Sequence, residues 1–361
     1  MCPCFDGKKI FLLILLIGLA VPARAYRKPK NYRRRKKTAA VAVSTETAKA
    51  SDDGLPPGRW APEVRAALLE FATRRGEGSP NYDPAKPPLA VLPLAGFAFK
   101  GDPAELVFWR LVREAKFQFS DDFWKEVPLA YGRQPLRAAY EQFSTLPDSV
   151  WGQQPTYHQF VKGFVKSYQD MCVKLDVKDC RAYLARLMIG FKDEEALSLA
   201  EETLKQERER PLAVEEVPTA DGDPAPARIG RGLREIPEAR ALAGFFAARG
   251  IELWFVEADV VQILEASAEG WPVPKERLLG IRQGRYRDRF DGEPLEPIPV
   301  RGGKVDAVVE ALGRAPDLVI GRAVGDAELL GYGSGLRIVI AGDPRLDALA
   351  KKKGWLLQPA F

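Results

Sequence analysis

The segment that most constrains the fold is a strand, turn and helix pattern near the C-terminus, at residues 316–330. Its first part, PDLVIG, is an apolar run of strand length that ends in glycine, GRAVGD is a turn, and DAELL begins a helix. A further helical pattern, GGKVDAVVEAL, precedes it at 302–312. Open α/β sheets bind ligands at the carboxyl ends of buried strands, so the pattern predicts charged side chains at such a position.

These two segments resemble the third and fourth motifs of the haloacid-dehalogenase (HAD) superfamily, in its phosphoserine-phosphatase-like branch. The third motif of that family is a lysine, often in a GK pair, and Gly303-Lys304 fits it. The fourth motif is a strand followed by GDSxGD, whose two carboxylates hold Mg²⁺. Gly325-Asp326 fits the end of this motif, but Arg322 stands where the family has its first aspartate.

Residues 243–282 resemble the second-motif unit of the same family. There a helix ending in RG leads to a strand, whose serine hydrogen-bonds the phosphate, and then to another helix. The matching tetrapeptide here is VEAD, at 256–259, so Glu257 stands where the phosphate-binding hydroxyl is expected and Asp259 follows it. Like charges in a cleft cost several kcal/mol at an effective dielectric of roughly 20, so Glu257 would repel a phosphate dianion.

The first motif of the family, DxDxT at the end of a buried strand, carries the covalent chemistry. Residues 87–111 have its framework, with the nucleophile position at Pro93 and the acid/base position at Ala95. No acidic residue lies at 84–100, so a one-residue shift would not recover a carboxylate. Phosphoryl transfer through an aspartyl-phosphate needs a carboxylate nucleophile, a second carboxyl group and a cation. Proline and alanine supply neither carboxyl group.

The resemblance implies an α/β fold, namely a HAD-like (Rossmannoid) parallel-sheet core with an inserted helical cap. It also implies a phosphatase-family protein that is catalytically inactive and has a binding or scaffold role, with an unknown protein or a small anionic ligand as its partner. The alternative is an atypical Mg²⁺-dependent phosphomonoesterase with a nucleophile outside the aligned positions. We expect no cofactor unless this alternative holds, because Mg²⁺ usually needs one or two carboxylates and Asp326 alone is a weak ligand.

The residual pocket of such a protein would be lined by the charged residues at the degenerate motifs, which are Glu257, Asp259, Lys304, Arg322 and Asp326. The guanidinium of Arg322 would balance Asp326 and Glu257, and Lys304 would complete a buried ionic cluster, which is compatible with folding when every charge is paired. Taken singly, each residue has an ordinary alternative. Lys304 would be a solvated lysine, Asp326 a helix N-cap, and Glu257 and Asp259 acids in the first turn of a helix.

The chain divides by composition into five stretches. Apolar residues recur at spacings of three and four between about 108 and 210, which predicts amphipathic helices in the place of the family's cap. Residues 211–237 are rich in Pro, Gly and charge and predict a connecting loop, and a similar stretch at 283–303 predicts a short β-excursion. We therefore expect a signal peptide (1–25), a basic, disordered linker (26–60), the start of the core (61–107), the cap with its connecting loop (108–237) and the remainder of the core (238–361).

The N-terminal stretch predicts export to the periplasm or the extracellular space. An apolar run at 10–22 is too short to span a bilayer comfortably and is followed by Ala23-Arg24-Ala25, a small-x-small cleavage pattern. The alternative is an uncleaved N-terminal membrane anchor. Residues 26–37 then hold eight Lys or Arg and no acid, which favours contact with an anionic membrane surface. A solvated linker without a specific partner would explain the same composition equally well. No recognised nucleic-acid-binding fold accompanies this run, so we predict no specific nucleic-acid binding.

The remaining chemistry is sparse. Cys172 and Cys180 lie in the predicted cap, and an oxidising compartment would allow a disulfide between neighbouring helices there. His158 is the only histidine, so a Ser-His-Asp triad, a Cys-His pair and a histidine-rich metal site have no support.

Overall fold

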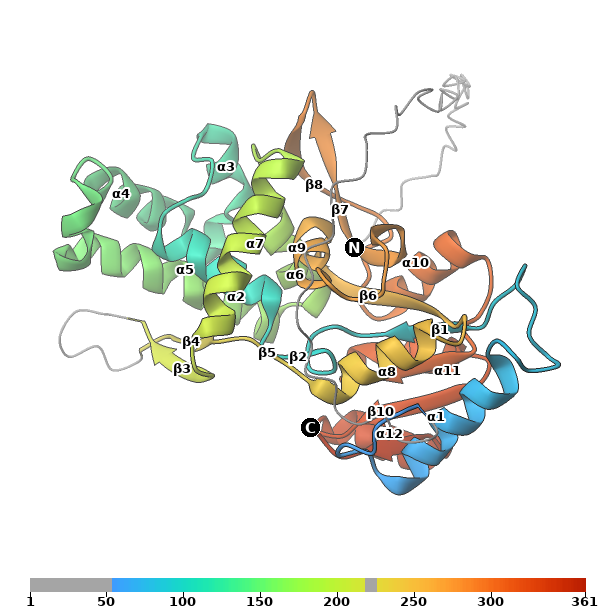
Figure 1. The fold of residues 1–361 in the computed structure, drawn as a ribbon. Coiled ribbons are helices and arrows are strands. Elements are labelled where there is room, and N and C mark those ends of the chain that lie inside the picture. The colour runs from blue at the N-terminus through green and yellow to red at the C-terminus, as the bar shows by residue number, and fades with distance from the viewer. Residues whose placement is uncertain (1–53, 218–225) are drawn as a thin grey trace, which may run out of the picture. The chain divides into compact units, whose positions relative to one another are not determined.

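The computed structural model describes residues 54–217 and 226–361 (Figure 1). The predicted signal peptide at 1–25 and the basic run at 26–37 lie outside these residues. Within 54–217 and 226–361, no helix combines the length and the apolar composition that crossing a membrane requires.

The core of the described chain is a seven-stranded sheet in the order β11-β10-β9-β1-β6-β7-β8. All neighbours in this sheet are parallel except β7 and β8, which form an antiparallel pair. The strands are β1 (Leu89–Leu92), β6 (Glu252–Val260), β7 (Leu278–Tyr286), β8 (Arg289–Leu295), β9 (Leu318–Gly321), β10 (Leu336–Ile340) and β11 (Leu356–Gln358). The chain passes from β1 to β6 on one side and returns to β9 on the other, so β1 lies at the point where the strand order reverses.

The two faces of the sheet are both covered by helices, which explains why β1 and β9 are buried along their whole length. Side chains of α1 (Pro62–Arg75) and α8 (Pro237–Ala247), such as Leu68 and Phe246, pack with one face. Side chains of α10 (Gly302–Leu312), α11 (Ala327–Tyr332) and α12 (Pro344–Lys353) pack with the other. The prediction of a parallel α/β core is thus confirmed.

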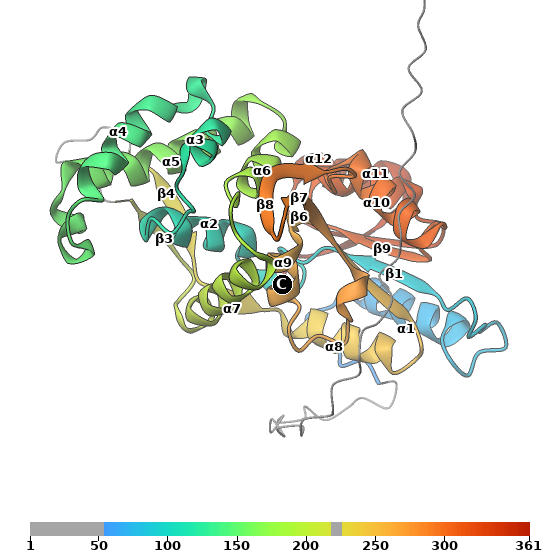
Figure 2. The same cartoon turned by 90° about the horizontal axis from the view of Figure 1, so that it is seen from above.

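A helical insertion lies between β1 and β6 in the chain, as the resemblance implies. Its helices are α2 (Pro103–Arg113), α3 (Asp121–Glu126), α4 (Arg133–Phe143), α5 (Pro155–Lys174), α6 (Val177–Arg186) and α7 (Asp193–Glu209); a further helix, α9 (Val261–Ser267), follows β6. In Figures 1 and 2, α3, α4 and α5 lie at one side of the picture and α10 and α11 at the other. The first helix begins at Pro103, five residues before the predicted start of the cap.

Two predicted stretches differ in the structure. The supposed loop at 211–237 contains three short strands, β3 (Ala213–Glu216), β4 (Arg228–Arg231) and β5 (Arg234–Glu235). The first two pair with each other, and β5 pairs with β2 (Phe99–Lys100). The predicted linker at 26–60 extended too far, because Leu55 and Trp60 are buried in the core and Trp60 makes an edge-to-face contact with Phe361. By contrast, the predicted β-excursion at 283–303 is present as the hairpin of β7 and β8.

Candidate functional site

The carboxyl ends of the three central strands bring the degenerate motifs together. Pro93 and Ala95 directly follow β1, Arg322 directly follows β9, and Glu257 lies near the end of β6. The pairing of β6 with β7 is irregular between Val256 and Val260, so the strand bulges where the second motif stands. The bulge allows the side chains of this short segment to take different directions.

Lys304 and Asp326 form the buried centre of the site. The Nζ atom of Lys304, in the first turn of α10, donates to Oδ1 of Asp326 over 2.7 Å, and both side chains are less than a tenth exposed. The adjacent Gly303 is required by packing, since a Cβ atom there would lie 1.9 Å from the carbonyl oxygen of Ile298. The GK pair therefore allows the start of α10 to approach the preceding loop closely and presents the lysine to the strand ends.

The second oxygen of Asp326 is also occupied. Oδ2 accepts hydrogen bonds from the backbone N–H groups of Arg322, at 2.8 Å, and Ala323, at 3.1 Å. Burial would raise the pKa of the Asp326 carboxyl, but the charge of Lys304 and these N–H groups outweigh it and hold the pKa below its ordinary value. Burial would likewise lower the pKa of Lys304, but Asp326 and Glu257 raise it well above its ordinary value. Both groups are therefore charged at neutral pH.

The carboxylate of Glu257 binds the loop that follows β1. Its Oε2 atom accepts from the backbone N–H groups of Leu94, at 2.9 Å, and Ala95, at 3.3 Å. Its Oε1 atom lies 3.8 Å from Nζ of Lys304. A carboxylate of this chain thus lies against two backbone donors and a lysine, an arrangement that suits an anion. Neither Glu257 nor Asp259 is in a helix, so the alternative of helix-start acids is wrong for both.

The guanidinium of Arg322 does not join this cluster, so the predicted balance of Arg322 against Asp326 and Glu257 is wrong. Arg322 is exposed, and among the described residues its side chain forms no ion pair. Only its backbone N–H contacts Asp326. The side chain lies over Gly96, where a Cβ atom would fall 2.0 Å from Nε of Arg322. The glycine has a φ of +73° and leaves room for the arginine beside the loop.

Asp259 pairs with the helical insertion and not with Lys304 or Asp326. Its side chain is 2% exposed, and its Oδ1 atom lies 3.7 Å from Nη1 of Arg181 on α6. Oδ2 of Asp259 has no hydrogen-bond partner among the described residues. Arg181 also binds Asp102, the N-cap residue of α2, with Nη2 at 2.7 Å from Oδ2. Asp259 therefore belongs to a second charged cluster, at the contact between the insertion and the sheet.

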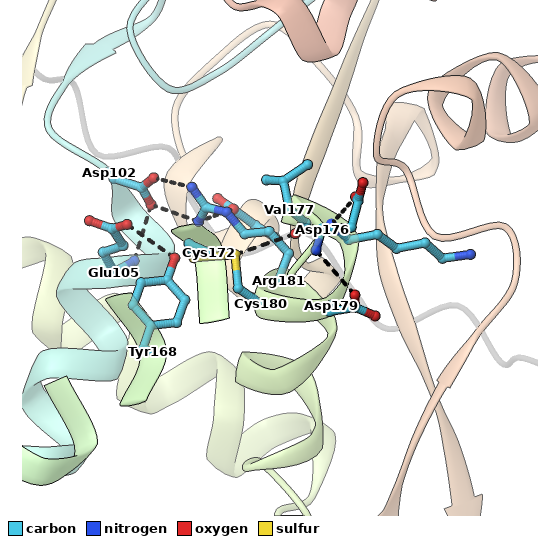
Figure 3. Close-up of a disulfide and its surroundings, with 11 residues drawn as sticks. Asp102, Glu105, Tyr168, Cys172, Asp176, Val177, Asp179, Cys180 and Arg181 are labelled. Atoms are coloured by element: carbon cyan, nitrogen blue, oxygen red, sulfur yellow. Dashed lines mark hydrogen bonds and ion pairs between the residues drawn. A yellow bond between two sulfur atoms is a disulfide. The ribbon is translucent and has the colours of Figure 1, made fainter. Parts of the chain in front are cut away.

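Sequence reasoning missed Asp102 and Arg181 as members of a charged cluster. They are 79 positions apart, and each has an ordinary local role, as a helix cap or a helical arginine. A usable signal was present only for Asp102, because an aspartate directly before a helical pattern is typical of a helix N-cap. Cys172 and Cys180 form a disulfide beside this cluster (Figure 3). His158 bonds to the carbonyl group of Gly152, away from both clusters.

Comparisons with known proteins agree with this architecture. No protein-family model matches the chain, and no curated protein sequence matches it. Among solved structures, a conserved protein of unknown function from Anaerococcus prevotii is similar, with a TM-score of 0.71 and 20% identity over 85% of this chain and 94% of that one. This likeness shows the fold alone. The parallel sheet and the helical insertion after β1 agree with the HAD-like fold that the sequence predicts.

Two more distant overlaps are with proteins described as hydrolases. A HAD family hydrolase from Salmonella enterica aligns with a TM-score of 0.41 and 9% identity, over 80% of this chain and 75% of that one. A probable phosphoserine phosphatase from Vibrio cholerae aligns with a TM-score of 0.38 and 10% identity, over 74% of this chain and 59% of that one. Overlaps at this level say nothing about the activity of this chain.

The residues present do not fit the Mg²⁺ ion of a HAD-like phosphatase. One oxygen of Asp326 is taken by Lys304 and the other by two N–H groups, so neither is directed at an empty coordination position. Pro93 and Arg322 stand where further carboxylate oxygens would be needed. In the part of the chain that the structure describes, no group of three or more His, Cys, Asp or Glu side chains is arranged to hold a metal. We therefore derive no chemical step through a metal.

Proposed function

We propose that this chain is a non-catalytic HAD-like protein in which Glu257 fills the anion-binding position of the former phosphatase site. The observation that carries the proposal is the contact of Glu257 with the N–H groups of Leu94 and Ala95 and with Lys304. A phosphate group would need the same donors and would meet the negative charge of Glu257. Pro93 and Ala95 provide no nucleophile and no acid or base.

The charges of the site support a closed pocket. Lys304 is already paired with Asp326 and faces Glu257, so it has no spare charge for a ligand. A binding or scaffold role would then use the outer surface of the protein, with a protein or a small anionic molecule as the partner.

We also propose that the protein is exported and that residues 26–37 contact anionic surfaces. The disulfide of Cys172 and Cys180 supports an oxidising compartment. Vesicles of phosphatidylserine and phosphatidylcholine test the second part, with the mature chain compared with a variant that lacks 26–37. Binding that is lost at high salt and on deletion supports it, and equal binding by both chains contradicts it.

The catalytic part is tested by hydrolysis of an aryl phosphate and of phosphoserine, with and without Mg²⁺. We expect no turnover by the folded mature chain, and the variant Lys304→Ala, Asp326→Ala is the control. Metal-dependent turnover that this variant loses would overturn the proposal and favour the atypical phosphomonoesterase.

The filled pocket is tested by replacement of the carboxylate. Glu257→Ser leaves two N–H groups and Lys304 without their anion, so inorganic phosphate should raise the melting temperature of the variant and not that of the wild type. Glu252→Gln is a matched control, since Glu252 begins the same strand and pairs with Arg277 away from the site. Equal stabilisation of the wild type by phosphate would show that Glu257 does not close the pocket.

A further inference from the structure

The second charged cluster joins the helical insertion to the sheet. We name it the junction cluster; it consists of Asp102, Glu105, Tyr168, Arg181 and Asp259. Arg181 binds both Asp102, at 2.7 Å, and Asp259, at 3.7 Å, and the hydroxyl group of Tyr168 donates to Oε1 of Glu105 over 3.0 Å (Figure 3). Asp102 and Glu105 are on the first turn of α2, Tyr168 is on α5, Arg181 on α6 and Asp259 on β6.

The junction cluster has more acids than bases. Three carboxyl groups share one guanidinium, and the side chains of Asp102, Arg181 and Asp259 are at most 24% exposed. The nearest further charges are Glu257 and Lys304, which face Asp259 from the sheet side and are engaged with each other and with Asp326. A buried excess of negative charge is costly, so the cluster is stable only with protons on some of its acids.

The surroundings shift the pKa values of the three acids in different directions. Burial would raise the pKa of Asp102, but Arg181 and the backbone donors of α2 outweigh it and hold the pKa below its ordinary value. Burial and the charges of Asp102 and Glu257 raise the pKa of Asp259 well above its ordinary value. Burial and the charge of Asp102 raise the pKa of Glu105 to about 7. Arg181 and Asp102 therefore balance each other, the surroundings of Asp259 favour its protonated form, and Glu105 changes charge near neutral pH.

Glu105 can exchange its proton with solvent. Asp102 and Glu105 line a cavity of about 380 Å³, whose other wall is formed by the hairpin of β3 and β4. The one other charged residue lining this cavity, Arg231, is already paired with Glu207 and Glu215. No cation that lines the cavity is thus left to compensate an ionised Glu105.

The disulfide restrains the position of Arg181, which is the counter-ion of the cluster. Cys180 immediately precedes Arg181 on α6, and its bond to Cys172 fastens this turn to the end of α5. Cys180 is fully buried. Arg181 therefore stays near Asp102 and Asp259 while the charge of Glu105 changes.

We propose that the junction cluster is a proton-dependent latch, in which the contact of Arg181 with Asp259 holds the insertion against the sheet while Glu105 is protonated and is loosened when Glu105 is ionised. The loosening follows from the uncompensated negative charge that ionisation adds beside Asp102. A carboxyl group with a raised folded pKa contributes stability that is complete below its unfolded pKa and is lost as the pH rises through the folded value. The contact should therefore be tightest below about pH 4.5, weaken as the pH rises to about 7 and change little above it.

Hydrogen exchange of the full mature chain, corrected for the intrinsic pH dependence of exchange, tests the latch. We expect the protection of amides in α2 and α6 to fall by about tenfold or more between pH 5.5 and pH 7 and to change little above pH 7. Glu105→Gln should remove this pH dependence. Glu114→Gln, at the other end of α2, is the matched control and should keep it, because Glu114 pairs with Arg110 and Lys116 outside the cluster.

A second variant keeps the test decisive if Glu105→Gln does not fold. Tyr168→Phe preserves the ring and removes the hydroxyl group whose hydrogen bond lowers the pKa of Glu105, so the pH at which protection levels off should move upward. Constant protection of the wild type between pH 5.5 and pH 7 would overturn the latch, and so would a levelling-off pH that Tyr168→Phe leaves unchanged.

Discussion

The ammonium group of Lys304 lies 2.7 Å from a carboxylate oxygen of Asp326, and the pair is buried at the carboxyl end of the central strand. In the HAD phosphatases that the motifs resemble, the two positions would serve a phosphate and a metal. Here they serve each other, and Glu257 lies beside them at 3.8 Å. The same residues that would carry catalysis therefore contribute to folding, which makes their removal measurable as a change in stability.

Replacement of Lys304 should be strongly destabilising. Lys304→Ala leaves Asp326 and Glu257 buried without their cation, and breaking a buried pair from one side costs about 3–5 kcal/mol. Urea unfolding measures the loss. Lys351→Ala, at an exposed lysine of α12, should change the free energy of unfolding by less than about 0.5 kcal/mol. A loss of similar size in both variants would mean that the Lys304 pair contributes little.

The two adjacent glycines at the start of α10 should respond differently to the same change. In Gly303→Ala the new Cβ atom would fall 1.9 Å from the carbonyl oxygen of Ile298, so we expect a loss of about 1–3 kcal/mol as the helix start shifts. In Gly302→Ala it would meet no atom within 4 Å, and the variant should be neutral or more stable by up to about 1 kcal/mol. Thermal unfolding of both variants checks this; an equal response would exclude the close approach at Gly303.

The loss of folding stability at acid pH should depend on Asp326. Its folded pKa is below the unfolded value, so its contribution is complete above about pH 4 and is lost as the pH falls further. Asp326→Asn should be less stable than the wild type by about 2–3 kcal/mol at pH 7. The gap should narrow between pH 4 and pH 2.5, as followed by urea unfolding at each pH. A gap that stays constant over this range would contradict the ionised pair.

Reduction of the disulfide should weaken the insertion. A crosslink between residues eight positions apart is expected to contribute about 2–3 kcal/mol through the entropy of the unfolded chain. Urea unfolding with and without dithiothreitol measures this contribution. The variant with both Cys172→Ser and Cys180→Ser should have the stability of the reduced protein and should not respond to the reductant. A wild type that is equally stable in both conditions would show that the crosslink is not formed in solution.

The core of the fold was predictable because its strands are continuous apolar runs. Residues 89–92 and 318–321 are buried on both faces, and no other element explains such runs of that length. The strands β3 and β4 were missed because they are short and rich in charge. Their pairing depends on tertiary contacts, such as that of Arg231 with Glu207 on α7, and not on a local pattern.

In the candidate site, the backbone positions of the motif residues were predictable from their spacing in the sequence. The directions of their side chains were not, because a long side chain can adopt several rotamers at the same backbone position. Lys304 and Asp326 meet because their strands and helices are neighbours in this fold. Arg322 follows β9 as predicted, but its long side chain turns towards Gly96 and solvent. The partnership of Asp259 with Arg181 joins the second motif to the middle of the insertion, and no local sequence pattern connects them.

The hydrogen bonds from Leu94 and Ala95 to Glu257 also bear on the order in which a carboxylate nucleophile could be introduced at this site. A single Pro93→Asp change would place a new carboxylate at the residue before Leu94, close to one that is already bound there, and repulsion would oppose it. The same change made after Glu257→Ser would meet free donors instead. The two positions are therefore epistatic, and residue 257 would have to change before residue 93.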